Sequence, residues 1–147
     1  MTGRTKAWWA AAAIYVLALT AASLMPSGRE AGALAGWDDR ITSGLQNALH
    51  VPAYGLLVVL LHRAAARRFG ASWASVGVAA GVSLLIGLGL EVAQGMIPGR
   101  LATVSDILHN AAGCVAAALV LRLIAAVHPD RQSGPGRVAG RSKKGIA

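Results

Sequence analysis

The sequence predicts an all-α membrane protein with four transmembrane helices and both termini in the cytoplasm. Of its 147 residues, 55% are hydrophobic and only 14% are charged, which gives a mean hydropathy of +0.55. A soluble chain of this size would leave large apolar patches exposed. Four segments, each close to the roughly 20 apolar residues that cross a bilayer, account for this excess. They are Ala7–Met25, Ile41–Leu61, Phe69–Leu90 and Ile107–Val127.

The charges that flank these segments predict the orientation. Only three basic residues (Arg29, Arg40 and Arg100) fall in the first and third loops, together with five of the six acids. The other eleven basic residues lie near the termini or after the second segment, so the positive-inside rule places those parts in the cytoplasm. The net charge of +8 does not predict nucleic-acid binding, because no aromatic residue interleaves the basic residues after residue 128.

The first two segments contain recognisable helix signals. The first follows Arg4 and Lys6 and ends at Met25-Pro26, a helix stop. Its basic start and the small residues at 20–23 resemble a secretory signal, but its apolar run is longer than a usual signal core, so we expect an uncleaved helix. The second segment contains Pro52, which removes one backbone hydrogen bond and predicts a kink near His50.

The third and fourth segments are rich in small residues. In the third, small residues recur every fourth position before Glu91 (Ser75, Ala79, Ser83 and Gly87), and Gly77 and Gly81 form a second such pair. This spacing lets helices approach closely in lipid. In the fourth, Cys114 is expected to be a small core residue. Residues 1–128 therefore predict one membrane domain, and the Gly-, Ser- and basic-rich residues 129–147 predict a disordered cytoplasmic tail.

Polar residues at one depth form the candidate site. The second segment contributes a histidine and a tyrosine four residues apart, which share a helix face. The ends of the third and fourth segments contribute two acid–amide pairs, and the loop between them contributes an arginine. Such groups in a membrane usually face the bundle interior and indicate function. The set is His50, Tyr54, Glu91, Gln94, Arg100, Asp106 and Asn110.

Each of these residues also has a purely structural interpretation. Tyr54 could be a packing residue with a hydrogen-bonded hydroxyl. Asp106 could be an acid favoured by the helix dipole, with Ser105 or Thr103 as the cap. Glu91 and Arg100 could form an ion pair that fixes the loop. The convergence of three helices at one depth nevertheless favours a shared site in the outer half of the membrane.

The spacing of these residues resembles that of the VanZ-like family of bacterial membrane proteins. The similar motifs are His50-x3-Tyr54, Glu91-x2-Gln94, Pro98-Gly99-Arg100 and Asp106-x3-Asn110-x2-Gly113, and the first segment also ends in a similar way at Ser23-Leu24-Met25-Pro26. The resemblance covers roughly residues 10 to 125. One departure is Gln46-Asn47, which stands where the family usually has Asp-Lys. It leaves open whether Asp38, Asp39 or Arg40 supplies a charge there.

The resemblance implies a multi-pass protein of the bacterial cytoplasmic membrane with a role in the cell envelope. The family's namesake is associated with low-level resistance to teicoplanin, a lipid-tailed glycopeptide that targets cell-wall precursors. The partners we expect are membrane lipid, a lipid-linked cell-wall precursor or a lipoglycopeptide, and a second copy of the chain.

Two hypotheses for the activity remain open. In the first, the protein binds or shields a ligand, and Tyr54, Gln94, Arg100 and Asn110 contact its polar headgroup. In the second, it is an intramembrane enzyme in which Glu91 or Asp106 is the general base and His50 the acid or orienting residue. No motif of an established hydrolase or nucleotide-binding class is present. The usual helical His/Glu spacings of metalloenzymes are also missing, so the sequence predicts neither a metal nor a cofactor.

Overall fold

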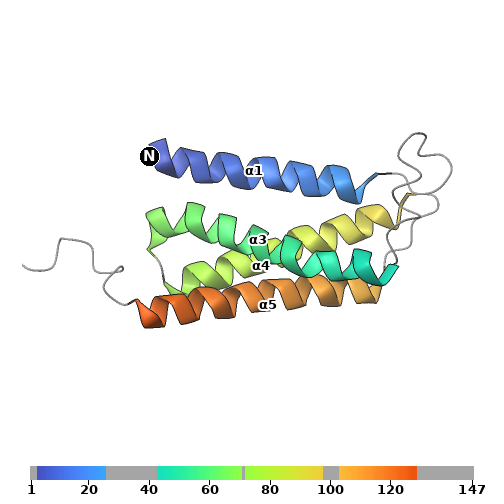
Figure 1. Ribbon diagram of the computed structural model, residues 1–147. Coiled ribbons are helices and arrows are strands. Elements are labelled where there is room, and N and C mark those ends of the chain that lie inside the picture. Colours follow the sequence, from blue (N-terminus) through green and yellow to red (C-terminus); the bar gives the residue numbers. More distant parts are fainter. Residues whose placement is uncertain (1–2, 26–42, 71, 98–102, 129–147) are drawn as a thin grey trace, which may run out of the picture.

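The computed structural model describes residues 3–25, 43–70, 72–97 and 103–128. These residues form four helices, α1 (Gly3–Ser23), α3 (Ser43–Phe69), α4 (Trp73–Gln94) and α5 (Val104–Val127) (Figure 1). Each helix is long and apolar enough to cross a membrane. For the described residues, the prediction of an all-helical protein with four helices able to span a membrane is therefore confirmed. The tail predicted over residues 129–147 lies outside the described residues.

The end of α3 differs from the predicted boundary. The apolar stretch was expected to end at Leu61, but the helix continues to Phe69, so Arg63 lies in a helix and not in a loop. Alanine and arginine both favour helix, and nothing before Gly70 interrupts it. Gly70 has a φ of 76°, a left-handed conformation that glycine adopts readily and that commonly ends helices. Helix-stop chemistry, and not hydropathy, sets this boundary.

Capping residues also move the starts of α4 and α5. α4 begins at Trp73 and not at Phe69, because the Ser72 and Ser75 side chains each accept a hydrogen bond from the other's backbone N–H. α5 begins at Val104, three residues before the predicted start. There the Thr103 hydroxyl accepts a hydrogen bond from a backbone N–H of the first turn. α1 likewise begins at Gly3, before the predicted Ala7.

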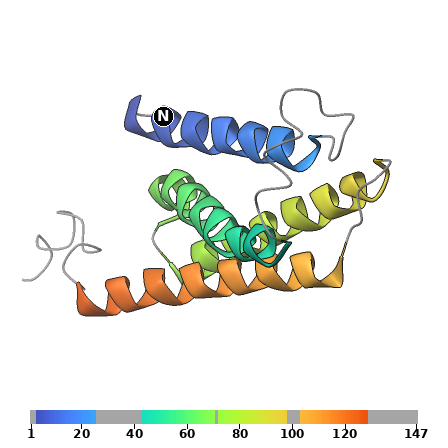
Figure 2. The same cartoon turned by 45° about the vertical axis from the view of Figure 1, so that its right-hand side comes forward.

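α3 is the central helix of the bundle. It contacts α1, α4 and α5, and it lies between α1 and α5 when the molecule is seen from either of two directions (Figures 1 and 2). α4 and α5 also pack against each other, whereas α1 contacts α3 and, less extensively, α4. A hydrogen bond of 3.1 Å from the Tyr15 hydroxyl to the carbonyl oxygen of Ala53 links α1 to α3.

The two ends of the bundle differ in charge. α1 and α4 finish at the end where α3 and α5 begin (Figure 1). We call this the acidic end, because Glu91 and Asp106 lie in the helix turns there. The opposite end, where α1 begins and α5 finishes, is the basic end, with Arg4, Arg63 and Arg122 in its turns.

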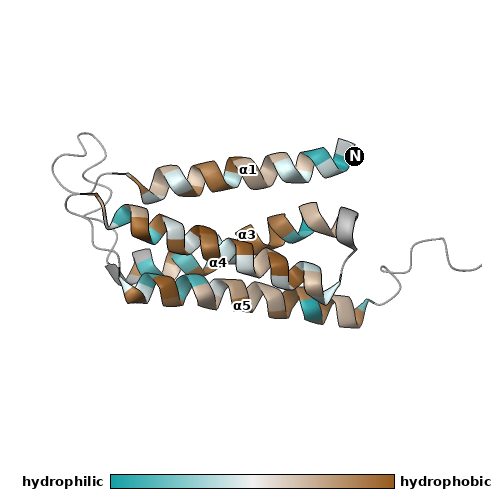
Figure 3. Ribbon diagram, turned by 180° about the vertical axis from the view of Figure 1, so that it is seen from behind, coloured by the Kyte–Doolittle hydropathy of each residue, from teal (hydrophilic) through white to brown (hydrophobic). Residues whose placement is uncertain are grey.

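Apolar side chains cover the outside of the bundle, and polar ones lie inside it. Hydrophobic or small residues run along the middle of the helices, whereas hydrophilic residues gather towards the helix ends (Figure 3). Exposed apolar side chains come from every helix and include Leu17, Leu49, Leu85 and Leu119. Buried polar ones include Ser75, Ser83, Glu91, Gln94, Asp106 and Asn110. This distribution suits a hydrocarbon environment, in which polar groups must find partners within the protein.

One set of small residues forms a helix contact and the other does not. The α4 residues Ser75, Ala79, Ser83 and Gly87 are all buried, as close packing required. In contrast, Gly77 and Gly81 are exposed, and a Cβ at either position would have no atom within 4 Å. The second pair therefore makes no helix contact within the described chain.

Candidate functional site

His50, Glu91 and Asn110, from three different helices, meet near the acidic end of the bundle. The Nδ1 atom of His50 lies 2.7 Å from the Oδ1 atom of Asn110 and 3.8 Å from the Oε1 atom of Glu91. Asn110 is fully buried and Glu91 is only 2% exposed, whereas the His50 side chain keeps 23% of its surface exposed. The two oxygen groups are therefore internal, and His50 connects them with the outside.

These distances fix the chemistry of the imidazole ring. The two oxygen atoms near Nδ1 can only accept hydrogen bonds. Nδ1 is therefore protonated and donates a hydrogen bond to the amide oxygen of Asn110. In the neutral ring, Nε2 is then the acceptor, and in the protonated ring it is a second donor. The hydrogen bond at Nδ1 thus sets the ring orientation and the tautomer of His50. In many functional histidines, the hydrogen bond of one ring nitrogen sets the state of the other in the same way.

The amide nitrogen of Asn110 is a buried donor. Within the part of the chain that the structure describes, Nδ2 of Asn110 has no hydrogen-bond partner. A buried unsatisfied donor costs about 1–3 kcal/mol, so few occur in native proteins, and they frequently mark functional positions. This donor therefore needs an acceptor beyond the described residues.

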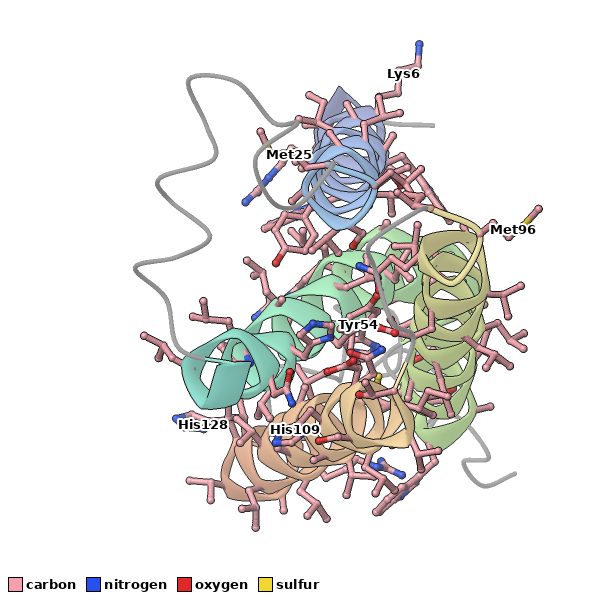
Figure 4. All side chains as sticks on the ribbon, turned by 90° about the vertical axis from the view of Figure 1, so that its right-hand side faces the viewer. Lys6, Met25, Tyr54, Met96, His109 and His128 are labelled. Carbon is pink, nitrogen blue, oxygen red and sulfur yellow. The ribbon has the colours of Figure 1, made fainter. Side chains whose placement is uncertain are left out.

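Tyr54 and Gly87 form the wall of this cluster. The rings of His50 and Tyr54 stack, with centroids 6.1 Å apart and an interplanar angle of 21°. A Cβ on Gly87 would lie 2.8 Å from Cε1 of Tyr54, which would have to shift, and 3.0 Å from Nδ2 of Asn110, a tight contact. Seen from the acidic end, Tyr54 points inward among α3, α4 and α5 (Figure 4). We call His50, Tyr54, Gly87, Glu91 and Asn110 the His50 cluster.

Two predicted site residues make other contacts. Gln94 donates from Nε2 to the carbonyl oxygen of Ser23, 2.9 Å away, and so ties the end of α4 to the last residue of α1. Asp106 accepts a hydrogen bond of 2.6 Å from the Thr103 hydroxyl, while its own N–H donates to that hydroxyl. These contacts give Asp106 a capping role, one of its structural interpretations. Arg100 lies outside the described residues.

The first turns of α3 and α5 carry further polar contacts that the sequence did not indicate. Asn47, at the departure from the family's usual pattern, donates from Nδ2 to the Ser105 hydroxyl, 3.3 Å away. The Nδ1 atom of His109 lies 2.6 Å from the carbonyl oxygen of Ser105 in its own helix. The sequence indicated Gly87 only as a small residue. Its spacing of four residues from Glu91 places both on the same face of α4, and this spacing is the feature that predicts its position in the cluster.

The described residues do not include three His, Cys, Asp or Glu side chains placed together as a metal site requires. What the cluster offers is a set of hydrogen-bonding groups, namely an imidazole, an amide and a carboxylate. These groups recognise polar parts of a ligand or transfer protons.

The comparison with protein families identifies the chain's relatives. The VanZ/LLP1 family model matches residues 12–125, a range that includes every member of the His50 cluster. No curated protein and no solved structure gives a significant match. With four helices able to span a membrane, the chain is a multi-pass membrane protein that belongs to the VanZ/LLP1 family.

Proposed function

We propose that this protein acts in the bacterial cell envelope by binding the polar part of a lipid-linked or lipid-tailed molecule at the His50 cluster. The observation that carries the proposal is the fully buried Asn110, whose Nδ2 has no partner among the described residues. It lies beside His50, which reaches the surface. We place the cluster in the outer half of the cytoplasmic membrane, in accord with the basic residues that flank the helices.

The surroundings of His50 favour a ligand with an apolar tail. Leu45 and Leu49 on α3 are about half exposed, and Leu108 on α5 is 63% exposed. A polar headgroup at His50 would leave its tail against these side chains, in contact with lipid. Cell-wall precursors carried on lipids and lipoglycopeptides such as teicoplanin both have this form. The VanZ resemblance, through its association with teicoplanin resistance, points to the same class.

Binding in nanodiscs tests the proposal. Teicoplanin, its deacylated form and a lipid-linked cell-wall precursor are titrated against the protein and against His50→Gln. We expect the tailed molecules to bind more tightly than the deacylated one. His50→Gln should weaken binding by about tenfold, close to the loss of one hydrogen bond.

His109→Gln is the matched control for this substitution. His109 is another partly exposed histidine near the acidic end, but its Nδ1 is bonded to its own helix. It should leave the affinity unchanged. Equal effects of the two substitutions, or no binding of any tailed probe, would overturn the proposal.

A second candidate function is catalysis, and one distance favours it. The Glu91 carboxylate lies 3.8 Å from the His50 ring, an arrangement that supports a histidine acting as general base through Nε2. Glu91→Gln and Asp106→Asn keep the shape of each side chain and remove its charge. A binding protein would keep most of its affinity in both variants. An enzyme that relies on Glu91 would lose about 10²–10⁴-fold in turnover of a lipid-linked precursor, measured by mass spectrometry of the products.

A further inference from the structure

A second polar cluster lies at the basic end, far from the His50 cluster along the helices. It is formed by His62 of α3, Trp73 and Ser75 of α4 and Arg122 of α5, and we call it the Arg122 cluster. The Arg122 guanidinium lies over the ring of Trp73. The Ser75 hydroxyl oxygen lies 3.4 Å from Nδ1 of His62. These two contacts bring α3, α4 and α5 together here.

The Arg122 charge has no counter-ion in the described chain. Its Nε and Nη2 atoms are buried and have no hydrogen-bond partner among the described residues. The two described carboxylates, Glu91 and Asp106, belong to the acidic end of the bundle. The Trp73 ring attracts the cation through its face but accepts no conventional hydrogen bond. A guanidinium within a membrane-spanning helix usually pairs with a partner, so these N–H groups call for an anion beyond the described residues.

The chemistry of the cluster selects phosphate. A guanidinium has a planar fork of N–H donors that matches phosphate oxygens in pairs. His62 and Ser75 beside it are 8% and 5% exposed. The Ser75 hydroxyl already donates to the carbonyl oxygen of Ser72, 2.8 Å away, so the guanidinium supplies the donors that select the anion. Trp73 is the first residue of α4 and is 75% exposed. Such a position is typical of an indole at the membrane interface, the depth of lipid headgroups.

We propose that the Arg122 cluster is a binding site for the phosphate of an anionic phospholipid, seated between α3, α4 and α5 at the basic end. Basic pockets between transmembrane helices on the cytoplasmic side are known to hold anionic headgroups. The positive-inside distribution of this chain predicts that its basic end faces that leaflet. The site is independent of the function proposed for the His50 cluster.

Native mass spectrometry of the full chain tests this site. Protein in detergent is titrated with phosphatidylglycerol and, separately, with zwitterionic phosphatidylcholine, and the retained lipid is counted. We expect phosphatidylglycerol to be retained preferentially. Arg122→Gln should reduce the retention of phosphatidylglycerol about fivefold. This factor corresponds to the attraction between one basic residue and an anionic lipid close to it. Arg122→Lys keeps the charge but not the fork and should give an intermediate loss.

Arg63→Gln is the matched control, since Arg63 is exposed on α3 at the same end and its substitution changes the net charge equally. Its effect should be less than twofold. Equal losses in the Arg63→Gln and Arg122→Gln variants would show general charge attraction and overturn the site. A titration with inorganic phosphate separates the two sources of the anion. If millimolar phosphate displaces the lipid and binds with the same dependence on Arg122, the site is for free phosphate and the lipid assignment is wrong.

Discussion

The side chains of His50 and Asn110 lie 2.7 Å apart and join α3 to α5, with Asn110 fully buried. Hydrogen bonds between transmembrane helices contribute little to stability, about 0.6 kcal/mol on average, because the unfolded helices in the membrane also find partners. The main effect of this hydrogen bond is therefore to orient the His50 side chain, and not to stabilise the fold. It holds the imidazole ring with Nδ1 towards the interior, so that its other nitrogen is available to a ligand.

Replacing Asn110 with Leu should separate function from folding. The change removes the acceptor for His50 and raises the hydrophobicity of α5, so insertion into the membrane should be unchanged. We expect the free energy of unfolding, measured by titration with a denaturing detergent, to fall by about 0.5–2 kcal/mol. Binding of the tailed ligand should be lost.

Asn47→Leu is the control for this variant. It makes the same chemical change in α3, where the Asn47 side chain donates a hydrogen bond to the Ser105 hydroxyl. It should leave ligand binding largely intact. Normal ligand binding by Asn110→Leu would remove Asn110 from the proposed site.

Gly113→Ala should loosen the contact between α3 and α5. A Cβ at Gly113 would overlap the backbone carbonyl of Val51, which has no flexible side chain to give way. Overpacking of this kind costs about 1–3 kcal/mol. The His50–Asn110 bond, which joins the same two helices nearby, should weaken with it. Unfolding in a denaturing detergent and ligand binding both report the effect.

Gly77→Ala is the matched control for the glycine prediction. A Cβ there meets no atom within 4 Å in the described chain, and alanine favours helix more than glycine does. The substitution should therefore leave stability unchanged or raise it slightly. A larger loss from Gly77→Ala than from Gly113→Ala would mean that the exposed glycine face is covered in the membrane, for example by a second copy of the chain.

The sequence predicted the fold class and four members of the His50 cluster, because hydropathy and helical spacing act locally. His50 and Tyr54 share a face by their spacing alone, and Glu91 and Asn110 come to the same end through the antiparallel order of the helices. Pairings between helices could not be read in the same way. Whether Gln94 contacts His50 or Ser23 depends on how the helices are rotated about their axes, which side-chain packing decides.

Helix ends were the other feature that hydropathy did not set. The charges after Leu61 suggested a loop, but charged and alanine residues continue a helix as well as apolar ones do until Gly70 stops it. Asp106 was open to two interpretations, and the position of Thr103 gives it a capping contact. At the end of α3 the backbone conformation of Gly70, and not the burial of apolar surface, sets the boundary.

Removal of residues 129–147 should leave the membrane domain intact. These residues are Gly-, Ser- and basic-rich and have little apolar surface to bury. We expect the truncated chain to insert, to unfold at the same detergent concentration and to bind the tailed ligand as before. Its attraction to vesicles containing anionic lipid should fall by about 1 kcal/mol for each basic residue that lies close to the surface. Failure to insert would contradict the predicted domain boundary.

Both termini should lie in the cytoplasm, with the acidic end of the bundle outside. Eleven basic residues against three predict this orientation. It can be tested with single cysteines in a Cys114→Ala background, at Met96, 81% exposed near the acidic end, and at Ala74, exposed near the basic end. A membrane-impermeant thiol reagent added to intact cells should label Met96→Cys and should reach Ala74→Cys only after the cells are opened. The opposite pattern would place the His50 cluster at the cytoplasmic face, where it could not meet a lipid-tailed antibiotic arriving from outside.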